Sequence, residues 1–534
     1  MTQKYDYAIL KLPDSGKEAI PGMAFYIVDN SIFLEYRSRR MIQTLCNDLV
    51  KGINVRENLI SLNKEIKRED MFDQFLDMYY EYEDVFKGFL DHEDAKVRKN
   101  IIKILGLVAD PELLDMLMDH YKNETTQFLK SDYLDAFKAF DYKEQLPFLK
   151  ERLEAVMAEE RTKHSIEEMK SLQNLIWKLE PPKKHSFVSS ASEEKVLLVV
   201  PRGHEPVVLE EVNAIPDTQA KALAGGVLLR TKHLEEVCKI RTYQALLFDF
   251  YPAAIPSQDG KGVGETLIEK GLMNYIFNHH KEKHPFLFRV DVKGVNDIQK
   301  KNLFAKNISM SLEEQSQGML INDSSFYEIE IRVIVSPKGC RVFLKFSGLK
   351  DMRFVYRKYA MSTSMQPSKA ALMMRYLKPY MKADANVLDP FCGTGTLLVE
   401  RAYADKVKSL YGLDISGPAI QAAWDNSQRA GKILNLVQRN FNDFQHEYVF
   451  DEIITDMPRQ TANIKQKQLE YVYKLLFLRS RELLADQGIL AVYCEDEYLM
   501  ERCLKENSWL KRCKKVVMTK DKTSFIYILQ KLYN

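Results

Sequence analysis

The residues best suited to chemistry lie in 386–400, whose sequence is NVLDPFCGTGTLLVE. A short apolar run leads into Asp389, Gly393 and Gly395 follow, and a pattern with helical spacing begins near Thr396. Glycines let the backbone turn tightly and approach a ligand, and a helix N-terminus presents unpaired N–H groups. The pattern predicts a ligand at the carboxyl end of the first strand of a doubly wound sheet, although the third glycine of a dinucleotide fingerprint is missing.

A second predicted strand, 409–415 (SLYGLDI), brings a carboxylate to the same edge of the sheet. It ends near Asp414, about 20 residues past the glycine turn, where an acid can accept hydrogen bonds from both ribose hydroxyls. The alternative is that Asp414 caps the helix that begins near Ser416. The ribose interpretation is favoured and indicates a ligand that carries a nucleoside.

Two more predicted strands end in polar residues. Residues 434–441 (LNLVQRNF) end in Asn440 and Phe441, an amide and a ring suited to the edge and face of adenine. Residues 450–458 (FDEIITDMP) run into Asp456, Met457, Pro458 and Arg459. The remaining strands of a seven-stranded sheet with a terminal hairpin are predicted at 488–494, 515–518 and 524–529.

The elements in front of this sheet differ in kind. The chain has 534 residues, of which 46% are hydrophobic and 28% charged, so it is a multidomain globular protein and not a collagen-like or disordered one. Residues 36–180 show apolar residues at helical spacing with few Pro and Gly. Within them, 103–121 aligns loosely with 135–153, which resembles HEAT-like helical pairs; an irregular helical domain is the alternative.

A linker is predicted at 181–185 (PPKKH), where two prolines stop the helix. Strands follow at 195–200 and from 226, helix-like stretches at 232–247, and a strand–helix–strand–turn–strand pattern over 286–346. This middle region is therefore predicted to be α+β.

Charge is unevenly distributed along the chain. Residues 1–185 carry 28 basic and 34 acidic side chains, a net charge of −6, whereas 281–360 carry 15 basic and 9 acidic ones, a net of +6. A polyanion would therefore be held by the middle region. The candidates for phosphate contact are Lys293, Lys300, Lys301, Lys306, Arg332, Arg341, Lys345, Arg353, Arg357 and Lys358.

The sequence predicts no metal site and no membrane span. Seven cysteines without paired spacing indicate free thiols in a reducing compartment, so we expect a cytoplasmic protein. His279, His280 and His284 lie close together, but we interpret them as a solvated helix end. No apolar run approaches the roughly 18 residues that a transmembrane helix needs.

Together these residues make a family recognisable. The block DPFCGTGT, Asp414, the Asp-x-Pro at 456–458 and the segment FVYRKYAMSTSMQPSKAALM at 354–373 resemble the class I S-adenosylmethionine-dependent RNA methyltransferases. Among these, the chain is most similar to the THUMP-domain enzymes that methylate the 2-amino group of guanine. Residues 286–350 resemble a THUMP module, and 195–247 the ferredoxin-like portion beside it. The helical front is not a usual part of the family.

The resemblance implies a Rossmann-like methyltransferase domain over 361–534, a ferredoxin-like and THUMP-like RNA-binding region over 190–360, and a HEAT-like region over 1–185. It implies that S-adenosylmethionine is the cofactor. The approach segment would place Ser364 and Pro367 against it. The residues implied to surround its methionine part are Asp389, Phe391, Gly393, Gly395 and Thr396. Asp414 is implied to hold its ribose, and Asn440 and Phe441 its adenine.

The motif at 456–459 carries the catalytic expectation. The Asp456 carboxylate and the Met457 carbonyl could each accept one N–H of a guanine 2-amino group, which would aim the nitrogen lone pair at the methyl group, and Pro458 would stiffen the turn. The family usually has an aromatic residue at the fourth position, where this chain has Arg459. Its guanidinium could stack on a flipped base or contact a phosphate, or it could simply point into solvent.

We therefore expect an RNA guanine methyltransferase that acts on tRNA. The alternatives are a ribosomal RNA enzyme, a catalytically weakened RNA-binding protein that retains the cofactor fold, and a methyltransferase for proteins or small molecules. We expect the acidic helical front to be a protein-binding or orienting scaffold and not an RNA surface.

Overall fold

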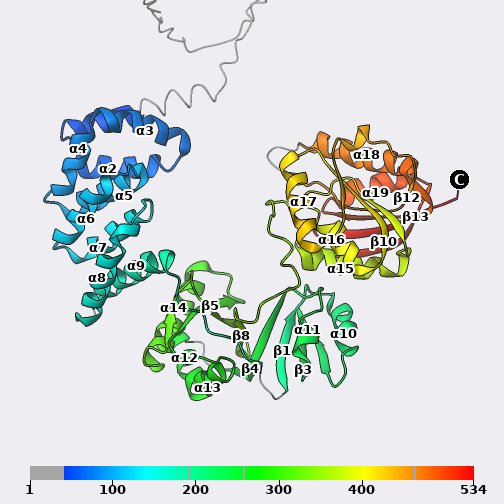
Figure 1. Cartoon of the computed structure of the whole chain (residues 1–534), viewed down its shortest axis with the longest axis horizontal. Coiled ribbons are helices and arrows are strands. Elements are labelled where there is room, and N and C mark those ends of the chain that lie inside the picture. Colours follow the sequence, from blue (N-terminus) through cyan, green and yellow to red (C-terminus); the bar gives the residue numbers. More distant parts are fainter. Residues whose placement is uncertain (1–40, 161, 190–192, 257–258, 461–464, 534) are drawn as a thin grey trace, which may run out of the picture. The chain divides into compact units, whose positions relative to one another are not determined.

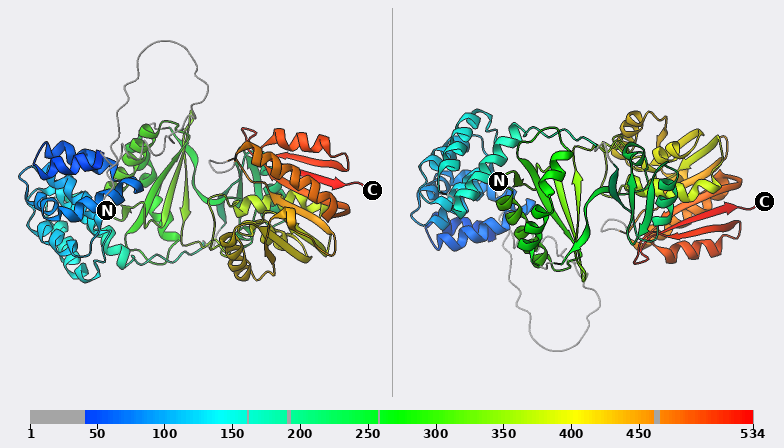
Figure 2. Two further views of the ribbon diagram at one scale, coloured as in Figure 1. Left: turned by 90° about the horizontal axis from the view of Figure 1, so that it is seen from above. Right: turned by 90° about the horizontal axis from the view of Figure 1, so that it is seen from below.

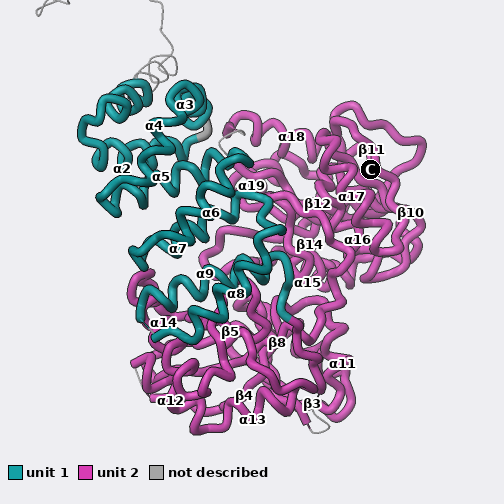
Figure 3. Tube along the Cα trace, turned by 60° about the vertical axis from the view of Figure 1, so that its left-hand side comes forward, with its two compact units in different colours: residues 1–182 teal, residues 183–534 magenta. Residues whose placement is uncertain are grey.

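The computed structural model describes residues 41–160, 162–189, 193–256, 259–460 and 465–533 (Figure 1). The chain forms two compact units that divide after Pro182 (Figure 3). The first unit is helical and the second carries two β-sheets. The finer domain limits predicted from the sequence stay a prediction.

The first unit confirms the predicted helical region, of which 36–40 lie outside the described residues. Residues 41–50 are helical. The elements that follow are α2 (Val55–Glu65), α3 (Glu69–Glu81), α4 (Glu83–Gly88), η1 (Phe89–Asp91), α5 (Ala95–Val108), α6 (Leu113–Asn123), α7 (Gln127–Phe137), η2 (Lys143–Gln145), α8 (Leu146–Ala158) and α9 (Lys163–Leu179).

Alternate helices of this unit stack in a row. Helix α2 packs on α5, α5 on α7, and α7 on α9. The two predicted repeat segments, 103–121 and 135–153, have the same arrangement. Each contains the end of one helix of the stacked row, a short connection, and most or part of the helix that follows in the chain. A row of this kind buries the apolar face that a single helical pair leaves open.

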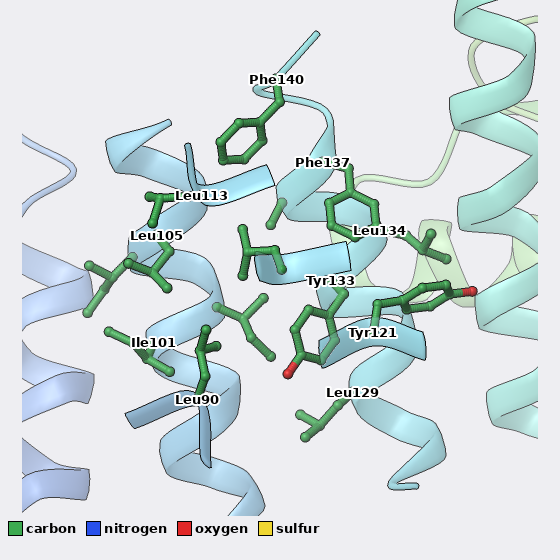
Figure 4. Close-up of a cluster of buried hydrophobic side chains, with 14 of the residues drawn as sticks. Leu90, Ile101, Leu105, Leu113, Tyr121, Leu129, Tyr133, Leu134, Phe137 and Phe140 are labelled. Atoms are coloured by element: carbon green, nitrogen blue, oxygen red, sulfur yellow. The ribbon is translucent and has the colours of Figure 1, made fainter. Parts of the chain in front are cut away.

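The apolar interior of the unit lies between α5, α6 and α7. Figure 4 shows Leu105 of α5 beside Leu113 of α6 on one side of the cluster and Phe137 of α7 beside Tyr121 of α6 on the other, and all four are fully buried. The Tyr121 hydroxyl leaves this interior to donate a 2.7 Å hydrogen bond to Glu168 of α9. A hydrogen bond of this kind offsets part of the free-energy cost of burying the Glu168 carboxylate.

The first sheet of the second unit has eight strands in the order β2-β3-β1-β4-β8-β7-β5-β6. Helices lie along it, as the green segments of Figure 2 show. Its elements are β1 (Glu194–Val199), α10 (Glu205–Asn213), β2 (Gln219–Leu223), β3 (Gly226–Thr231), α11 (Leu234–Val237), β4 (Ala245–Ile255), α12 (Gly260–Glu269), α13 (Leu272–Asn278), β5 (Phe286–Lys293), α14 (Ile298–Gln315), β6 (Leu320–Asn322), β7 (Ile329–Ser336) and β8 (Gly339–Phe346).

Strand β4 joins the two halves of this sheet. It pairs with β1 through Ala245–Phe248 and with β8 through Phe248–Ile255, both antiparallel. The predicted helix-like character of 232–247 is therefore wrong at its end, since only α11 is helical and the strand has begun at Ala245. A continuous apolar run does not distinguish a buried strand from a buried helix.

The predicted linker ends earlier than expected. His185 is 3% exposed, its Nδ1 lies 2.7 Å from Glu328 Oε1, and its ring stacks on Phe286. His279 and His280, which follow α13, are also buried, so the expectation of a solvated helix end is wrong for them. Burial lowers the pKa of His280.

The second sheet has seven strands in the order β11-β10-β9-β12-β13-β15-β14. The strands β9 to β13 are parallel, and β15 is antiparallel to both of its neighbours. Its elements are α15 (Pro367–Leu377), η3 (Lys378–Tyr380), β9 (Ala385–Asp389), α16 (Thr396–Ala404), β10 (Val407–Asp414), α17 (Gly417–Ala430), β11 (Asn435–Gln438), η4 (Phe441–Asp443), β12 (Phe450–Asp456), α18 (Gln466–Leu483), β13 (Leu484–Cys494), α19 (Glu497–Glu506), β14 (Leu510–Val517) and β15 (Phe525–Lys531).

The strand order of this sheet reverses beside β9. The chain proceeds from β9 to β10 and β11 on one side and then returns to β12 on the other. In a doubly wound sheet such a switch point leaves a crevice at the carboxyl ends of the strands. Asp389 ends β9 and Asp456 ends β12, so both lie at this crevice.

A buried ion pair ties the two sheets of the second unit together. Nε and Nη2 of Arg241, between α11 and β4, each donate a 2.8 Å hydrogen bond to the Glu400 carboxylate on α16. The Tyr356 hydroxyl donates a third, at 2.7 Å. The Glu400 side chain is 1% exposed, so its charge depends on these three donors.

Two further observations concern membrane-spanning helices and the cysteine thiols. Among the described residues, no helix combines the length and the apolar character that crossing a bilayer requires. The thiols of Cys46, Cys392, Cys494 and Cys503 are buried and free.

We expect Arg241→Met to lower the free energy of local unfolding around α16 by about 3 kcal/mol, because it leaves the Glu400 carboxylate buried without its cation. Native-state hydrogen exchange of the α16 amides measures this quantity. The double variant Arg241→Met/Glu400→Leu removes both charges and should recover most of the loss. Equal losses in the single and double variants would contradict the assignment.

Candidate active site

A cavity of about 240 Å³ opens at the carboxyl ends of β9, β10 and β12. Most residues predicted for the site line it, namely Ser364, Asp389, Phe391, Gly393, Thr396, Asp414, Asp456, Met457, Pro458 and Arg459. The sequence interpretation missed other lining residues, which are Met361, Thr363, Met365, Cys392, Thr394, Leu397, Ser416 and Ala419.

The two glycines of the turn after β9 have different tasks. Gly393 has a φ of +52°, and a Cβ built on it would meet nothing within 4 Å, so the turn leaves open space on the cavity side. Gly395 has a φ of +77° and does not line the cavity. A Cβ there would lie 3.2 Å from Cβ of Ala423, so this glycine serves the packing of the α16 start against α17.

Asp414 fixes the shape of the turn. Its Oδ2 accepts a 3.0 Å hydrogen bond from the Gly393 N–H, and its Oδ1 accepts a 2.8 Å bond from the Ser416 N–H. The cap of α17 is Ser416 itself, whose side chain accepts from the Ala419 N–H. The capping alternative therefore belongs to Ser416, while Asp414 lies at the cavity and joins the two loops.

Asp389 is a buried carboxyl, 1% exposed. Its Oδ1 accepts hydrogen bonds from the Phe391 N–H at 3.1 Å and from the Thr455 hydroxyl at 2.9 Å. Burial raises the pKa of Asp389 to about 8, despite the opposing effect of these two bonds. A cationic group in the cavity would favour its ionised form.

Asp456 presents an unsatisfied acceptor to the cavity. Its Oδ1 is buried and has no hydrogen-bond partner among the described residues. Burial raises the pKa of Asp456 to about 7, whereas Arg459 and Lys369 act in the opposite direction. The Thr396 hydroxyl at the start of α16 is a second buried polar group of the cavity without such a partner. Orphaned polar atoms of this kind indicate a missing ligand.

Arg459 lies between two carboxylates. Its Nη2 is 3.8 Å from Asp456 Oδ2, and its Nη1 is 3.2 Å from Glu495 Oε1, just after β13. The side chain is 34% exposed. Arg459 therefore borders the cavity instead of projecting away from it, and its charge acts directly on Asp456.

The approach segment before α15 closes one side of the cavity. The Ser364 and Thr394 hydroxyls are 3.1 Å apart, which joins this segment to the glycine turn. Asn426 of α17 strengthens the link, because its amide donates to the carbonyls of both Tyr359 and Thr394. Nothing in the local pattern distinguishes Asn426 from other helix residues. Pro367 is buried at the start of α15 and does not line the cavity.

Asn440 and Phe441 also lie off the cavity. The strand β11 ends before them, and Asn440 is exposed, where its side chain accepts from the Asn442 N–H. Phe441 is buried behind Phe391, with an edge-on ring contact at 5.8 Å. Phe391 is thus the ring that reaches the cavity, and the adenine contacts of the other two stay a prediction.

The predicted phosphate contacts divide by exposure. Those with exposed side chains are Lys293, Lys300, Lys306, Lys345 and Lys358, and Lys301 is half-buried. Arg332 pairs with Asp291 and Glu330, and Arg341 pairs with Asp249, so their charges are largely neutralised within the sheet.

The prediction is wrong for Arg353, which is 6% exposed. Its guanidinium pairs with Asp351 and donates to the carbonyls of Ile240 and Tyr243, so four of its five N–H groups are used within the protein and the buried side chain is not placed to contact a phosphate. Arg357 is half-buried and donates to the Ser364 carbonyl, which assigns it to the approach segment.

The raised pKa of Asp389 has a consequence for stability. The unfolded chain has an Asp pKa near about 3.9, so the ligand-free native state binds more protons between that pH and about 8. Stability should therefore fall as the pH rises through this window, by at most about 1.4 kcal/mol per pH unit. Asp389→Asn should make this dependence shallower in thermal unfolding and leave the share that Asp456 contributes below about pH 7, whereas Asp443→Asn on the surface should keep the whole dependence. An unchanged slope in Asp389→Asn would contradict the burial argument.

Comparison with known proteins finds similarity over the part of the chain that contains the cavity. Residues 355–524 match the family model UPF0020, described as an RMKL-like methyltransferase domain. The chain is 23% identical over 171 residues to the tRNA (guanine(10)-N2)-dimethyltransferase of Methanothermobacter thermautotrophicus, which covers 32% of this chain and 50% of that protein. It is 32% identical over 121 residues to the U6 snRNA (guanine-N(2))-methyltransferase THUMPD2 of Bos taurus. This alignment covers 22% of this chain and 21% of that protein.

A similar solved structure is that of TrmN from Thermus thermophilus. It has 18% sequence identity and a TM-score of 0.48, and it covers 64% of this chain and 100% of that chain. The chain spans about half the length of the first curated relative and about a fifth of the second. The predicted methyltransferase domain is confirmed: residues 355–524 form a methyltransferase domain of the UPF0020 type.

Proposed function

We propose that this protein transfers a methyl group from S-adenosylmethionine to the exocyclic 2-amino group of a guanine in RNA. The observation that carries the proposal is the buried, unpartnered Oδ1 of Asp456 in a cavity that also contains the Gly393 turn and Asp414. The names of these two relatives both specify N2 of guanine, in tRNA for one and in U6 snRNA for the other. They agree on the position in the base and differ in the RNA. We propose tRNA as the substrate, with ribosomal RNA as the alternative.

The residues of the cavity fit S-adenosylmethionine. When bound there, this cofactor supplies an electrophilic methyl group on a positively charged sulfur. Asp414 and the open turn at Gly393 would hold its ribose side, and Asp389, Phe391 and Thr396 its methionine part. Burial raises the free-energy cost of ionising Asp389 and Asp456, and a positive charge in the cavity would offset that cost.

The chain orients the amine that is to be methylated. An aromatic amine is a poor nucleophile because its lone pair is delocalised into the ring. Oδ1 of Asp456 can accept one of its N–H groups, and the Met457 carbonyl is the second proposed acceptor, so the nitrogen becomes pyramidal. The Met457 N–H donates to the Tyr493 carbonyl at 2.9 Å, which fixes the turn against β13. Such preorganised alignment accounts for much of the rate of group transfer.

The rest of the chain would bind and orient the RNA. The exposed lysines on and beside α14 support a THUMP-like role for the middle sheet, because contact with phosphates needs free cations. The stacked row of helices in the first unit supports a HEAT-like scaffold for a protein partner. The buried free thiols support a reducing compartment such as the cytoplasm.

A second candidate function rests on Arg459. Its contacts with Asp456 and Glu495 place a cation where the family has a stacking ring. If this cation prevents a base from approaching Asp456, the protein would bind cofactor and RNA without transferring a methyl group. Transfer from radiolabelled S-adenosylmethionine to bulk tRNA separates the two functions.

We expect Asp456→Asn to reduce methyl transfer to bulk tRNA by at least about 100-fold, because the amide oxygen can still accept an N–H but the neutral side chain cannot stabilise the developing positive charge as the carboxylate does. Binding of S-adenosylhomocysteine, measured by calorimetry, should persist and thus show that the cavity is intact. Asp443→Asn, an equal charge change on the surface, should transfer normally. Unreduced transfer in Asp456→Asn would remove this residue from the mechanism.

Arg459 should set the pH range of the reaction. Transfer needs ionised Asp456, so the second-order rate constant should rise with pH through about 7. Because Arg459 lowers the pKa of Asp456, Arg459→Gln should move this rise to higher pH, and Arg459→Lys should largely keep it in place. A pH profile identical in all three proteins would show that the cation does not act on Asp456.

A further inference from the structure

The helical unit carries a second hollow, of about 540 Å³, on the face formed by α2, α5 and α7. We call it the α2–α5–α7 groove. Helices α5 and α7 pack closely at the bottom of the groove, where a Cβ built on Gly106 would lie only 2.9 Å from Cβ of Ala136. The groove runs across the row of stacked helices, which is the surface that helical solenoids offer to partners.

The cations of the groove are not all neutralised. Lys103 and Lys99 of α5 lie 3.4 and 3.1 Å from the buried Asp132 carboxylate, so both cations are paired with that acid, although its Oδ2 accepts no hydrogen bond from a described residue. Lys64 and Lys67, at the end of α2, are exposed and form no ion pair with any described residue. The groove therefore presents two free ammonium groups toward solvent.

The carboxylates at the edge of the groove are already engaged. Asp135 pairs with Lys138 at 2.5 Å, just as Asp132 pairs with the two lysines of α5. A bound anion would therefore meet Lys64 and Lys67 without displacing an internal ion pair. This arrangement distinguishes the groove from an ordinary charged surface, where opposite charges alternate.

Apolar and amide groups complete the groove. Ile60 of α2 is 48% exposed and Leu107 of α5 is 43% exposed, and both line it. The Asn63 amide donates to the carbonyl and the side-chain oxygen of Asn100, which fixes α2 against α5. A complementary ligand would thus combine negative charge with apolar side chains.

We propose that the α2–α5–α7 groove binds an acidic segment of a partner protein, with carboxylates at Lys64 and Lys67 and apolar side chains at Ile60 and Leu107. This inference goes beyond methyl transfer and does not depend on it. RNA fits less well, because no described residue that lines the groove is aromatic or Arg and able to stack on a base.

The test uses the full chain and a fluorescein-labelled synthetic peptide of Glu and Leu residues, with bulk tRNA as the competing probe. Lys64→Glu/Lys67→Glu should weaken peptide binding by about tenfold or more, because two attractions become repulsions. The matched control Lys143→Glu/Lys163→Glu makes the same charge change at exposed positions outside the groove and should bind as the unaltered protein does. Ile60→Ser/Leu107→Ser should also weaken binding, without a change in charge.

Unfolding temperatures of all variants establish that the helical unit is intact. The proposal is overturned if the unaltered protein does not bind the peptide, or if Lys64→Glu/Lys67→Glu binds it equally well. It is also overturned, in favour of an RNA surface, if that variant loses affinity for tRNA and not for the peptide. Methyl transfer is a separate readout, so a failure of the groove and a failure of the proposed function remain distinguishable.

Discussion

The site depends on negative charge that is held out of water at the carboxyl ends of three parallel strands. Asp389, Asp414 and Asp456 face one small cavity, and burial raises the pKa of the first and the third to about 8 and about 7. A carboxylate in such surroundings is costly unless a positive charge joins it. A donor with a charged sulfur relieves that cost, whereas the same molecule after losing its methyl group carries one positive charge less. An ionised carboxylate in this cavity is therefore stabilised more by the charged methyl donor than by its demethylated product.

Helix α16 connects this electrostatic centre to the remainder of the second unit. Its first residue, Thr396, lines the cavity, and Glu400 one turn later accepts both hydrogen bonds from Arg241 of the middle sheet. A helical turn is stiff, so the position of the middle sheet and that of the glycine turn are set by the same element. The ion pair of Arg241 with Glu400 is therefore a direct link between the middle sheet and the helix that begins at the cavity.

Local sequence pattern predicted the elements around the cavity, because short apolar strands that end in Asp389, Asp414 and Asp456 have few alternative structures. It did not predict features that arise from distant contacts. The apolar run at the start of β4 has no period that separates strand from helix. The burial of His280, the hydrogen bonds of Arg353 to the Ile240 and Tyr243 carbonyls, and the hydrogen bonds of Asn426 to the Tyr359 and Thr394 carbonyls all depend on segments far away in the chain. The adenine contact predicted for Asn440 stays a prediction: a strand end fixes a region and not a side-chain direction, and Asn440 is not among the residues that line the cavity.

The shared strand β4 has a consequence for how this protein could have been assembled. Because Ala245–Phe248 complete one half of the middle sheet and Phe248–Ile255 the other, no break between the two halves leaves both edges covered. A fragment that ended before β4 would expose the backbone of β1, and one that began after it would expose that of β8, which invites aggregation. Each half of the middle sheet therefore depends on β4 to cover one of its edges.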